Sequence, residues 1–190
     1  MSYNYFKCHN IAFDNDFLNI NQDYYLIQLY KFRNTETNIA QFKYIDIADI
    51  LDCSKRTIRN YDQRLEQEGI INKVSNYGKP DKYKLLYSPE KNFTFLPNNG
   101  FIEWMDLDFY SKMMYYHLCR LGGKNGSVNI GYRKLIDRIK CSDKHKNKLK
   151  KLINLNLVDK VENGIYFNSY KVNNLAFDRG VDKFLETLYH

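Results

Sequence analysis

An internal repeat limits this chain to folds that place two copies of one module in tandem. Residues 47–55 (IADILDCSK) match residues 135–143 (LIDRIKCSD) in their apolar positions and in a shared Cys-Ser pair, at an offset of 88. Residues 69–74 (GIINKV) match residues 156–161 (NLVDKV) at an offset of 87. Because these elements agree in the same order, we interpret the 190 residues as two copies of one small domain.

The first copy is predicted to open with three helices. Apolar residues within 21–32 and within 47–51 recur with helical spacing. Ser54 follows a tight turn and is a favoured N-cap for a third helix, which Gly69 terminates. Three side chains of the third helix are expected in the core, namely Ile58, Tyr61 and Leu65.

Two strands are predicted after the third helix. Residues 70–74 are mostly apolar, residues 76–81 have turn chemistry, and residues 82–85 alternate between polar and apolar side chains. The first copy therefore ends in a two-stranded hairpin.

The second copy is predicted to repeat this order. Its elements are helices over 107–121 and 132–139, a third helix capped by Ser142, strands over 158–161 and 165–167 around an Asn-Gly turn at 163–164, and a C-terminal helix over 181–188.

This order of elements resembles that of winged helix-turn-helix domains, as do three sequence segments of the first copy. They are residues 54–60 (SKRTIRN), 65–71 (LEQEGII) and 78–85 (GKPDKYKL). The last segment is similar to the wings of Gram-positive plasmid and phage replication initiators. The resemblance covers residues 45–87 well and residues 101–172 loosely.

The resemblance implies a mainly α fold with small β-hairpins, in the α+β class. Two tandem winged helix-turn-helix domains are expected over residues 1–87 and 101–190. Residues 88–100 contain two prolines and are expected to form a linker or a packed connecting loop.

Positive charge is concentrated around the third helix of each copy. The chain has a net charge of +7, while residues 1–52 carry −3, residues 53–84 carry +4 and residues 133–151 carry +7. Nucleic acid is a natural partner for such basic segments. Asn, Lys, Tyr and Ile are frequent throughout, so an AT-rich coding sequence accounts for part of the lysine excess.

The third helix of the first copy carries the residue types that read base edges in a DNA major groove. Arg and Lys address guanine, while Asn and Gln address adenine. The expected DNA-binding residues on this helix are Lys55, Arg56, Thr57, Arg59, Asn60, Gln63 and Arg64. We expect Arg56, Arg59 and Asn60 to contact bases, and Lys55 and Arg64 to contact phosphates. Asp62 and Glu66 are expected to lie to one side of this helical face.

The third helix of the second copy is expected to contact phosphates, and the hairpin of the first copy is expected to contact phosphates or enter the minor groove. The hairpin residues are Lys73, Tyr77, Lys79, Lys82 and Lys84, and the helix residues are Lys144, Lys146, Asn147, Lys148 and Lys151. Alternatives remain open, because lysines also protect strand edges and solubilise helices. His145 aligns with Ile58 and is expected to be partly buried.

Enzyme classes with recognisable motifs are excluded. The sequence has no phosphate-binding Gly-rich loop and no dinucleotide fingerprint, and its four histidines are isolated. His117 and Arg120 have the spacing found in tyrosine recombinases, but we expect His117 to be a helix-surface or core-edge residue. No cofactor and no metal are expected.

The sequence thus favours a non-enzymatic, sequence-specific protein that binds double-stranded DNA. It would be a transcriptional regulator or a plasmid- or phage-type replication initiator, and a protein-interaction module built on winged helices is the alternative. A homodimer and contacts with replication or transcription machinery are left open. The four cysteines lack Cys-x-x-Cys spacing, and no apolar run is long enough for a membrane span, so we expect a cytoplasmic protein.

Overall fold

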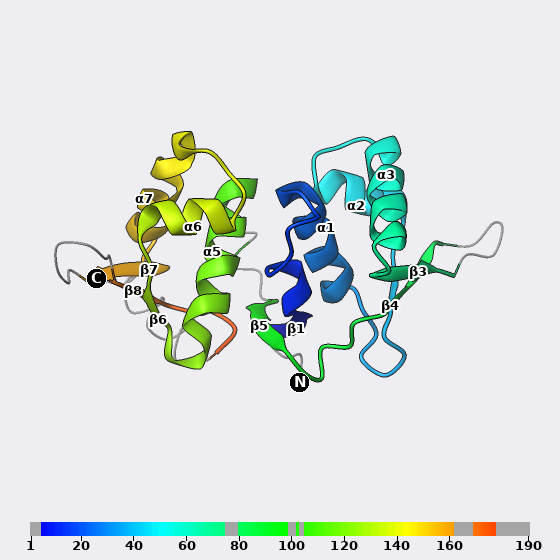
Figure 1. Cartoon of the computed structure of the whole chain (residues 1–190), viewed down its shortest axis with the longest axis horizontal. Coiled ribbons are helices and arrows are strands. Elements are labelled where there is room, and N and C mark those ends of the chain that lie inside the picture. Colours follow the sequence, from blue (N-terminus) through cyan, green and yellow to red (C-terminus); the bar gives the residue numbers. More distant parts are fainter. Residues whose placement is uncertain (1–4, 75–79, 99–101, 103–104, 162–168, 178–190) are drawn as a thin grey trace. The chain divides into compact units, whose positions relative to one another are not determined.

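Two compact units make up the chain. The computed structural model describes residues 5–74, 80–98, 102, 105–161 and 169–177 (Figure 1). Residues 8–93 form one unit, called here the N-terminal unit. The described residues from 94 onward, together with residues 5–7, form the C-terminal unit. The division after residue 93 falls inside the segment that was expected to connect two domains.

The described residues of the N-terminal unit form three α-helices and a small antiparallel sheet. Its elements are η1 (Asn10–Ala12), α1 (Ile20–Lys31), β2 (Ile39–Gln41), α2 (Tyr44–Ile50), α3 (Lys55–Gln67), β3 (Ile71–Lys73) and β4 (Lys82–Leu85). The strand order is β2-β4-β3. Helix α1 is buried along most of its length, which makes it the centre of this core.

The C-terminal unit repeats the same order of elements. They are α5 (Phe109–Gly122), η2 (Gly123–Asn125), β6 (Ser127–Asn129), α6 (Tyr132–Arg138), η3 (Asp143–His145), α7 (Lys146–Asn154), β7 (Val158–Val161) and β8 (Ser169–Val172). The strand order is β6-β8-β7, and α5 is the buried central helix. The chain is therefore mixed α and β, with helices beside small antiparallel sheets, in agreement with the predicted α+β class.

Backbone conformation matches between the two units at sites where few residue types fit. Asp52 and Lys140, which precede the two Cys-Ser pairs, have φ angles of 48° and 53°. Gly69 and Asn156, which end the third helices, have φ angles of 65° and 53°. Asn is the residue after Gly that best tolerates this left-handed conformation. The repeat in the sequence is thus a repeat of backbone conformation.

A strand that the sequence analysis missed precedes the second helix of each unit. In β2, Ala40 pairs with Tyr83, and in β6, Val128 pairs with Tyr170. Each strand has only three residues, so its alternation is too short to distinguish it from a loop. The strand forms because a hairpin strand far along the chain provides its hydrogen-bonding partner.

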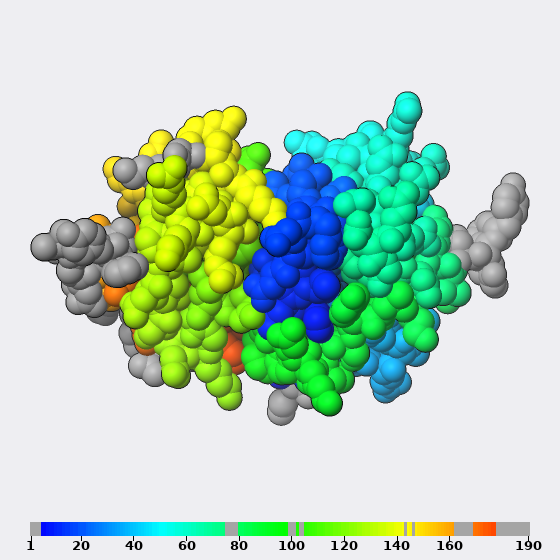
Figure 2. All heavy atoms as spheres, viewed as in Figure 1, coloured from blue at the N-terminus to red at the C-terminus, as the bar shows by residue number. Residues whose placement is uncertain are grey.

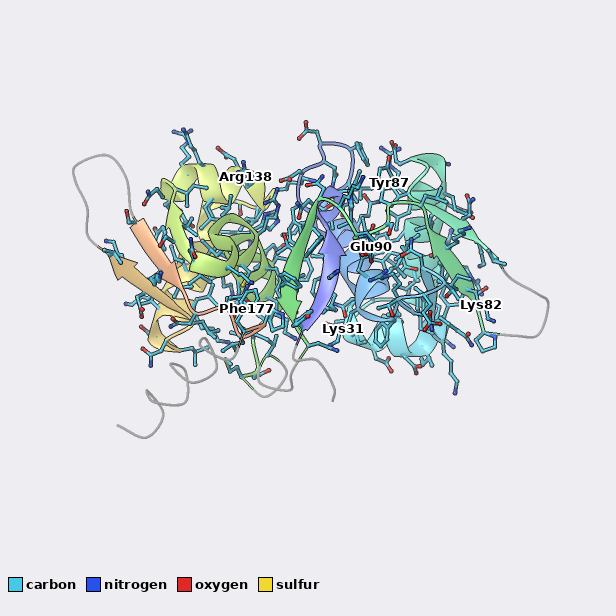
Figure 3. The ribbon with its side chains drawn as sticks, turned by 90° about the horizontal axis from the view of Figure 1, so that it is seen from below. Lys31, Lys82, Tyr87, Glu90, Arg138 and Phe177 are labelled. Carbon is cyan, nitrogen blue, oxygen red and sulfur yellow. The ribbon has the colours of Figure 1, made fainter. Side chains whose placement is uncertain are left out.

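The predicted connecting segment also contains a strand. Strand β5 (Phe93–Pro97) pairs with β1 (Tyr5–His9) in a two-stranded sheet. The Phe95 ring lies 4.7 Å from Tyr5 and 5.5 Å from Phe177, which is labelled in Figure 3. These contacts explain why residues 5–7 group with the C-terminal unit and not, as expected, with the first domain.

The third helix of the C-terminal unit begins later than predicted. Ser142 does not cap it, because a 3-10 turn (Asp143–His145) comes first and the α-helix starts at Lys146. The amide of His145 donates to the carbonyl of Ser142 over 3.1 Å. The offset between the copies falls from 88 to 87 here, and the tighter 3-10 turn takes up the missing residue. The predicted strand at 165–167 and helix at 181–188 lie outside the described residues, and β8 is the described return strand.

His117 is a core residue and not the surface or edge residue that was expected. It lies on α5 and is only 2% exposed. Burial, together with the positive charges of Lys140, Arg138 and Arg120, lowers the pKa of His117 to about 3. The folded protein therefore holds this imidazole neutral where the unfolded chain binds a proton.

Acid is expected to destabilise the C-terminal unit through His117. Since the folded pKa of about 3 lies below the ordinary 6.5, the stability that the neutral imidazole contributes is present above pH 6.5 and is lost as the pH falls toward 3. The loss in unfolding free energy between pH 7.5 and pH 5 should be about 2 kcal/mol. Urea unfolding at the two pH values measures it. His117→Gln should lose less stability than wild type over this interval, and an equal loss would show that His117 is not the titrating group.

None of the helices in the described ranges is both long and apolar enough to cross a membrane.

Candidate nucleic-acid interface

Helix α3 is a well-capped amphipathic helix on the surface of the N-terminal unit (Figures 1 and 2). The Ser54 hydroxyl accepts a hydrogen bond from the amide of Thr57 over 3.1 Å, as predicted for an N-cap. Ile58 and Leu65 are fully buried, so these two residues fix the rotation of the helix against its core. The opposite face of α3 is consequently presented to solvent.

Five polar residues of α3, which we call the basic stripe, are exposed together. They are Lys55, Arg56, Arg59, Asn60 and Gln63. Spacings of three and four residues place the last four on one helical face. Within the described part of the chain, no ion pair involves these five side chains. They are therefore available to an external partner.

Two predicted DNA-binding residues of α3 have contacts within the protein. Arg64 forms an ion pair with Glu68 at 2.8 Å and donates to the carbonyl of Phe17 over 3.0 Å. Thr57 is half-buried, and its hydroxyl lies 2.9 Å from that of Ser54 in the cap. These contacts stabilise the start of α3 and connect α3 to the loop before α1.

Asp62 lies in the core and not at the side of the exposed face, as was expected. It is 3% exposed, and its carboxylate accepts hydrogen bonds from three tyrosine hydroxyls. The donors are Tyr25 at 2.5 Å, Tyr44 at 2.5 Å and Tyr83 at 2.7 Å. We call these four residues the Asp62 cluster. Tyr61, which was expected in the core, is only half-buried.

Burial and hydrogen bonding act in opposite directions on Asp62. Burial raises the pKa of its carboxyl, while the three tyrosine hydroxyls and the charge of Lys73 lower it, and the pKa remains above its ordinary value. Burial and the neighbouring Tyr25 and Asp62 also raise the pKa of Tyr83, so its phenol stays protonated and donates. The Asp62 cluster joins α1, α2, α3 and β4 through one carboxylate.

Lys73 of β3, which was predicted to contact phosphate, contacts the Asp62 cluster. Its ammonium lies 3.1 Å from the carboxylate of Asp81 and 2.9 Å from the hydroxyl of Tyr44. It also lies over the rings of Tyr44 and Tyr83, at 5.2 and 5.6 Å from their centroids. Lys73 therefore stabilises the junction between the hairpin and α2, and its charge is already paired.

The remaining hairpin lysines point away from α3. Tyr83 faces Asp62 of α3, and side chains alternate along a strand, so Lys82 and Lys84 lie on the outer face of the sheet. Figure 3 labels Lys82 at the start of β4. The structure thus does not place these lysines on one surface with the basic stripe. Tyr77 and Lys79 lie outside the described residues.

Ion pairs also occupy part of the lysine-rich helix in the C-terminal unit. Asp108 caps α5 and lies 3.2 Å from Lys148 and 3.9 Å from Lys151. Burial alone would raise the pKa of Asp108, but hydrogen bonds from Ser111 and Lys148 hold it below its usual value. Lys144 and Asn147 are exposed, whereas the side chain of Lys146 is outside the described part.

His145 is buried, as its match with Ile58 predicted. It is 9% exposed, and its ring stacks on Tyr110 with 3.7 Å between centroids. Desolvation and the neighbouring Lys144 and Lys148 lower its pKa. This residue is therefore part of the packing at the start of α7.

The chain matches no model of a known protein family and no curated protein. Among the residues that the structure describes, no group of three or more His, Cys, Asp or Glu side chains is placed to hold a metal ion.

Proposed function

We propose that this chain binds double-stranded DNA in a sequence-specific manner, and that each unit is a winged helix-turn-helix domain. In the N-terminal unit, α2 and α3 are joined by a tight turn in which Asp52 has a left-handed conformation. A hairpin follows α3, and β2 completes a three-stranded sheet. Such an arrangement suits a domain that inserts its third helix into a major groove.

The observation that carries the proposal is the basic stripe on α3. An α-helix fits the major groove, and side chains on its first two turns reach base edges. Arg56 and Arg59 would donate to guanine, and Asn60 and Gln63 would pair with adenine. The stripe is exposed while the other side of α3 is buried, so binding DNA requires no rearrangement of the core.

The C-terminal unit would add phosphate contacts with little choice of sequence. Lys144 and Asn147 are exposed near the start of α7, and Lys150 is exposed one turn later. Lysine is a mobile point charge and a poor reader of base edges. We therefore propose that Lys82 and Lys84 of the first hairpin likewise contribute charge alone.

Selection of duplexes from a random pool by the full chain, followed by footprinting, tests the proposal. We expect enrichment of one motif, because the stripe offers four side chains that discriminate bases. Protection of several direct repeats would identify a replication initiator, and protection of a palindrome would identify a transcriptional regulator. Failure to enrich any motif would contradict sequence-specific binding and favour a protein-interaction module.

A further inference from the structure

Tyr44 occupies the junction of three elements, although the sequence gives no indication of a role for it. It is the first residue of α2 and is half-buried. Its hydroxyl donates to Asp62 of α3 and accepts from Lys73 of β3, and it lies 2.8 Å from the hydroxyl of Tyr83. The inner end of this side chain is therefore held from three sides.

The ring of Tyr44 reaches from this fixed hydroxyl to the edge of the basic stripe. The guanidinium of Arg59 lies 5.8 Å from the ring centroid, within the range of a cation–π interaction. Arg59 and Asp62 are three residues apart on α3, so one tyrosine contacts an inward and an outward residue of the same helix. No other contact described for Arg59 restrains its side chain.

Restraint matters for Arg59 because an arginine loses much rotamer freedom when it docks against a base. An aromatic ring that holds the guanidinium before binding reduces that loss. Lys55, Arg56, Asn60 and Gln63 have no corresponding aromatic contact in the described part of the chain. Arg59 is thus the one member of the basic stripe whose position is linked to the core.

We propose that Tyr44 is a positioning residue that sets the sequence specificity of the chain by pre-orienting Arg59. The inference rests on the proposed DNA-binding function and adds a structural reason why the chain would prefer one DNA sequence over others. Tyr44 itself touches no base in this proposal. It acts through Arg59, while Asp62, Lys73 and Tyr83 hold its hydroxyl in place.

A double-mutant cycle between Tyr44 and Arg59 tests the proposal. The probes are a duplex selected by the wild-type full chain and an unselected pool of duplexes of the same length. We expect Tyr44→Leu to weaken binding to the selected duplex about threefold to tenfold, which corresponds to one immobilised side chain, and to leave the unselected pool nearly unaffected. In the Arg59→Ala background, Tyr44→Leu should have no further effect on either probe.

Two further variants separate positioning from folding. Tyr25→Phe removes a hydrogen bond to the same Asp62 carboxylate and leaves the contact between Tyr44 and Arg59 intact, so it should leave the ratio of the two affinities unchanged. Tyr44→Phe keeps the ring and should retain most of the ratio. A loss of the ratio in Tyr25→Phe, or equal effects of Tyr44→Leu with and without Arg59, would overturn the inference.

Failure of the inference and failure of the proposed function give different results. If Arg59→Ala binds both probes like wild type, the assignment of α3 to DNA is wrong. If Arg59→Ala loses its preference for the selected duplex while Tyr44→Leu retains it, α3 reads DNA and only the role of Tyr44 is wrong.

Discussion

Replacing Arg56 and Arg59 together by alanine is expected to abolish most of the preference for a selected DNA sequence. Each arginine that contacts a guanine through two hydrogen bonds contributes about 1–3 kcal/mol of discrimination, so the pair should account for a loss of about 30-fold to 10⁴-fold in affinity for the selected duplex. Gel shifts with selected and unselected duplexes measure the change. Both side chains are exposed, so the fold should be retained.

The matched control for this prediction is Lys82→Ala combined with Lys84→Ala. It removes the same two charges from the same unit, on the face of the sheet opposite α3. Because the long-range attraction of a lysine charge for DNA does not depend on sequence, this variant should change the affinities for both duplexes by a similar factor. If the arginine variant also weakened both duplexes equally, α3 would supply charge but would not read bases.

Replacing Asp62 by leucine, the residue at the matching position 149 of the C-terminal unit, is expected to destabilise the N-terminal unit strongly. Tyr25 and Tyr83 are fully buried, and both would lose the carboxylate that accepts from their hydroxyls. A buried donor left without its acceptor costs about 1–3 kcal/mol, so we expect the unfolding free energy to fall by about 3–5 kcal/mol. Urea unfolding of the full chain measures it.

Two comparisons make the Asp62 prediction specific. Gln67→Leu, on an exposed position of the same helix, should change stability by less than about 0.5 kcal/mol. Combining Asp62→Leu with Tyr25→Phe and Tyr83→Phe should recover stability, because no fully buried tyrosine donor is then left unpaired. If the triple variant were less stable than Asp62→Leu alone, the cost would come from lost packing and not from unpaired hydroxyls.

The pH dependence of Asp62→Asn adds an independent check. Since the folded pKa of Asp62 is raised, the stability that its protonated form contributes is present below the ordinary pKa of 3.8 and is lost as the pH rises through the folded value. Asparagine cannot ionise. The difference in stability between wild type and Asp62→Asn should therefore be larger at pH 3 than at pH 7, and a constant difference would show that Asp62 does not titrate in the folded state.

Local sequence signals predicted those elements whose residues are adjacent in the chain. The strand over residues 82–85 has the predicted bounds, and α1 begins one residue before its predicted start. In these segments, periodicity, capping and turn chemistry all act within one element. The same signals missed β1, β2, β5 and β6, since each of these strands depends on a partner that is remote in sequence.

Helical periodicity alone did not predict which side chains of α3 are buried. Positions 58, 61 and 65 and positions 58, 62 and 65 both have helical spacing, and the more apolar Tyr61 was expected in the core. The structure buries Asp62 instead, because three tyrosines from other elements supply its hydrogen bonds. The spacing of the residues allows a carboxylate at position 62 to be buried. It does not reveal the hydrogen-bond donors from other elements that compensate the cost of that burial.

The carboxylate of Asp108 should alter how strongly the affinity of the C-terminal unit for DNA depends on salt concentration. Two lysines of α7 already have this anion as a counterion, so each must leave it before it can neutralise a phosphate. The release of condensed cations from DNA, which makes affinity fall with salt, depends on the phosphates that are actually neutralised. The slope of log affinity against log salt should therefore be shallower than the nine basic residues within 133–151 suggest.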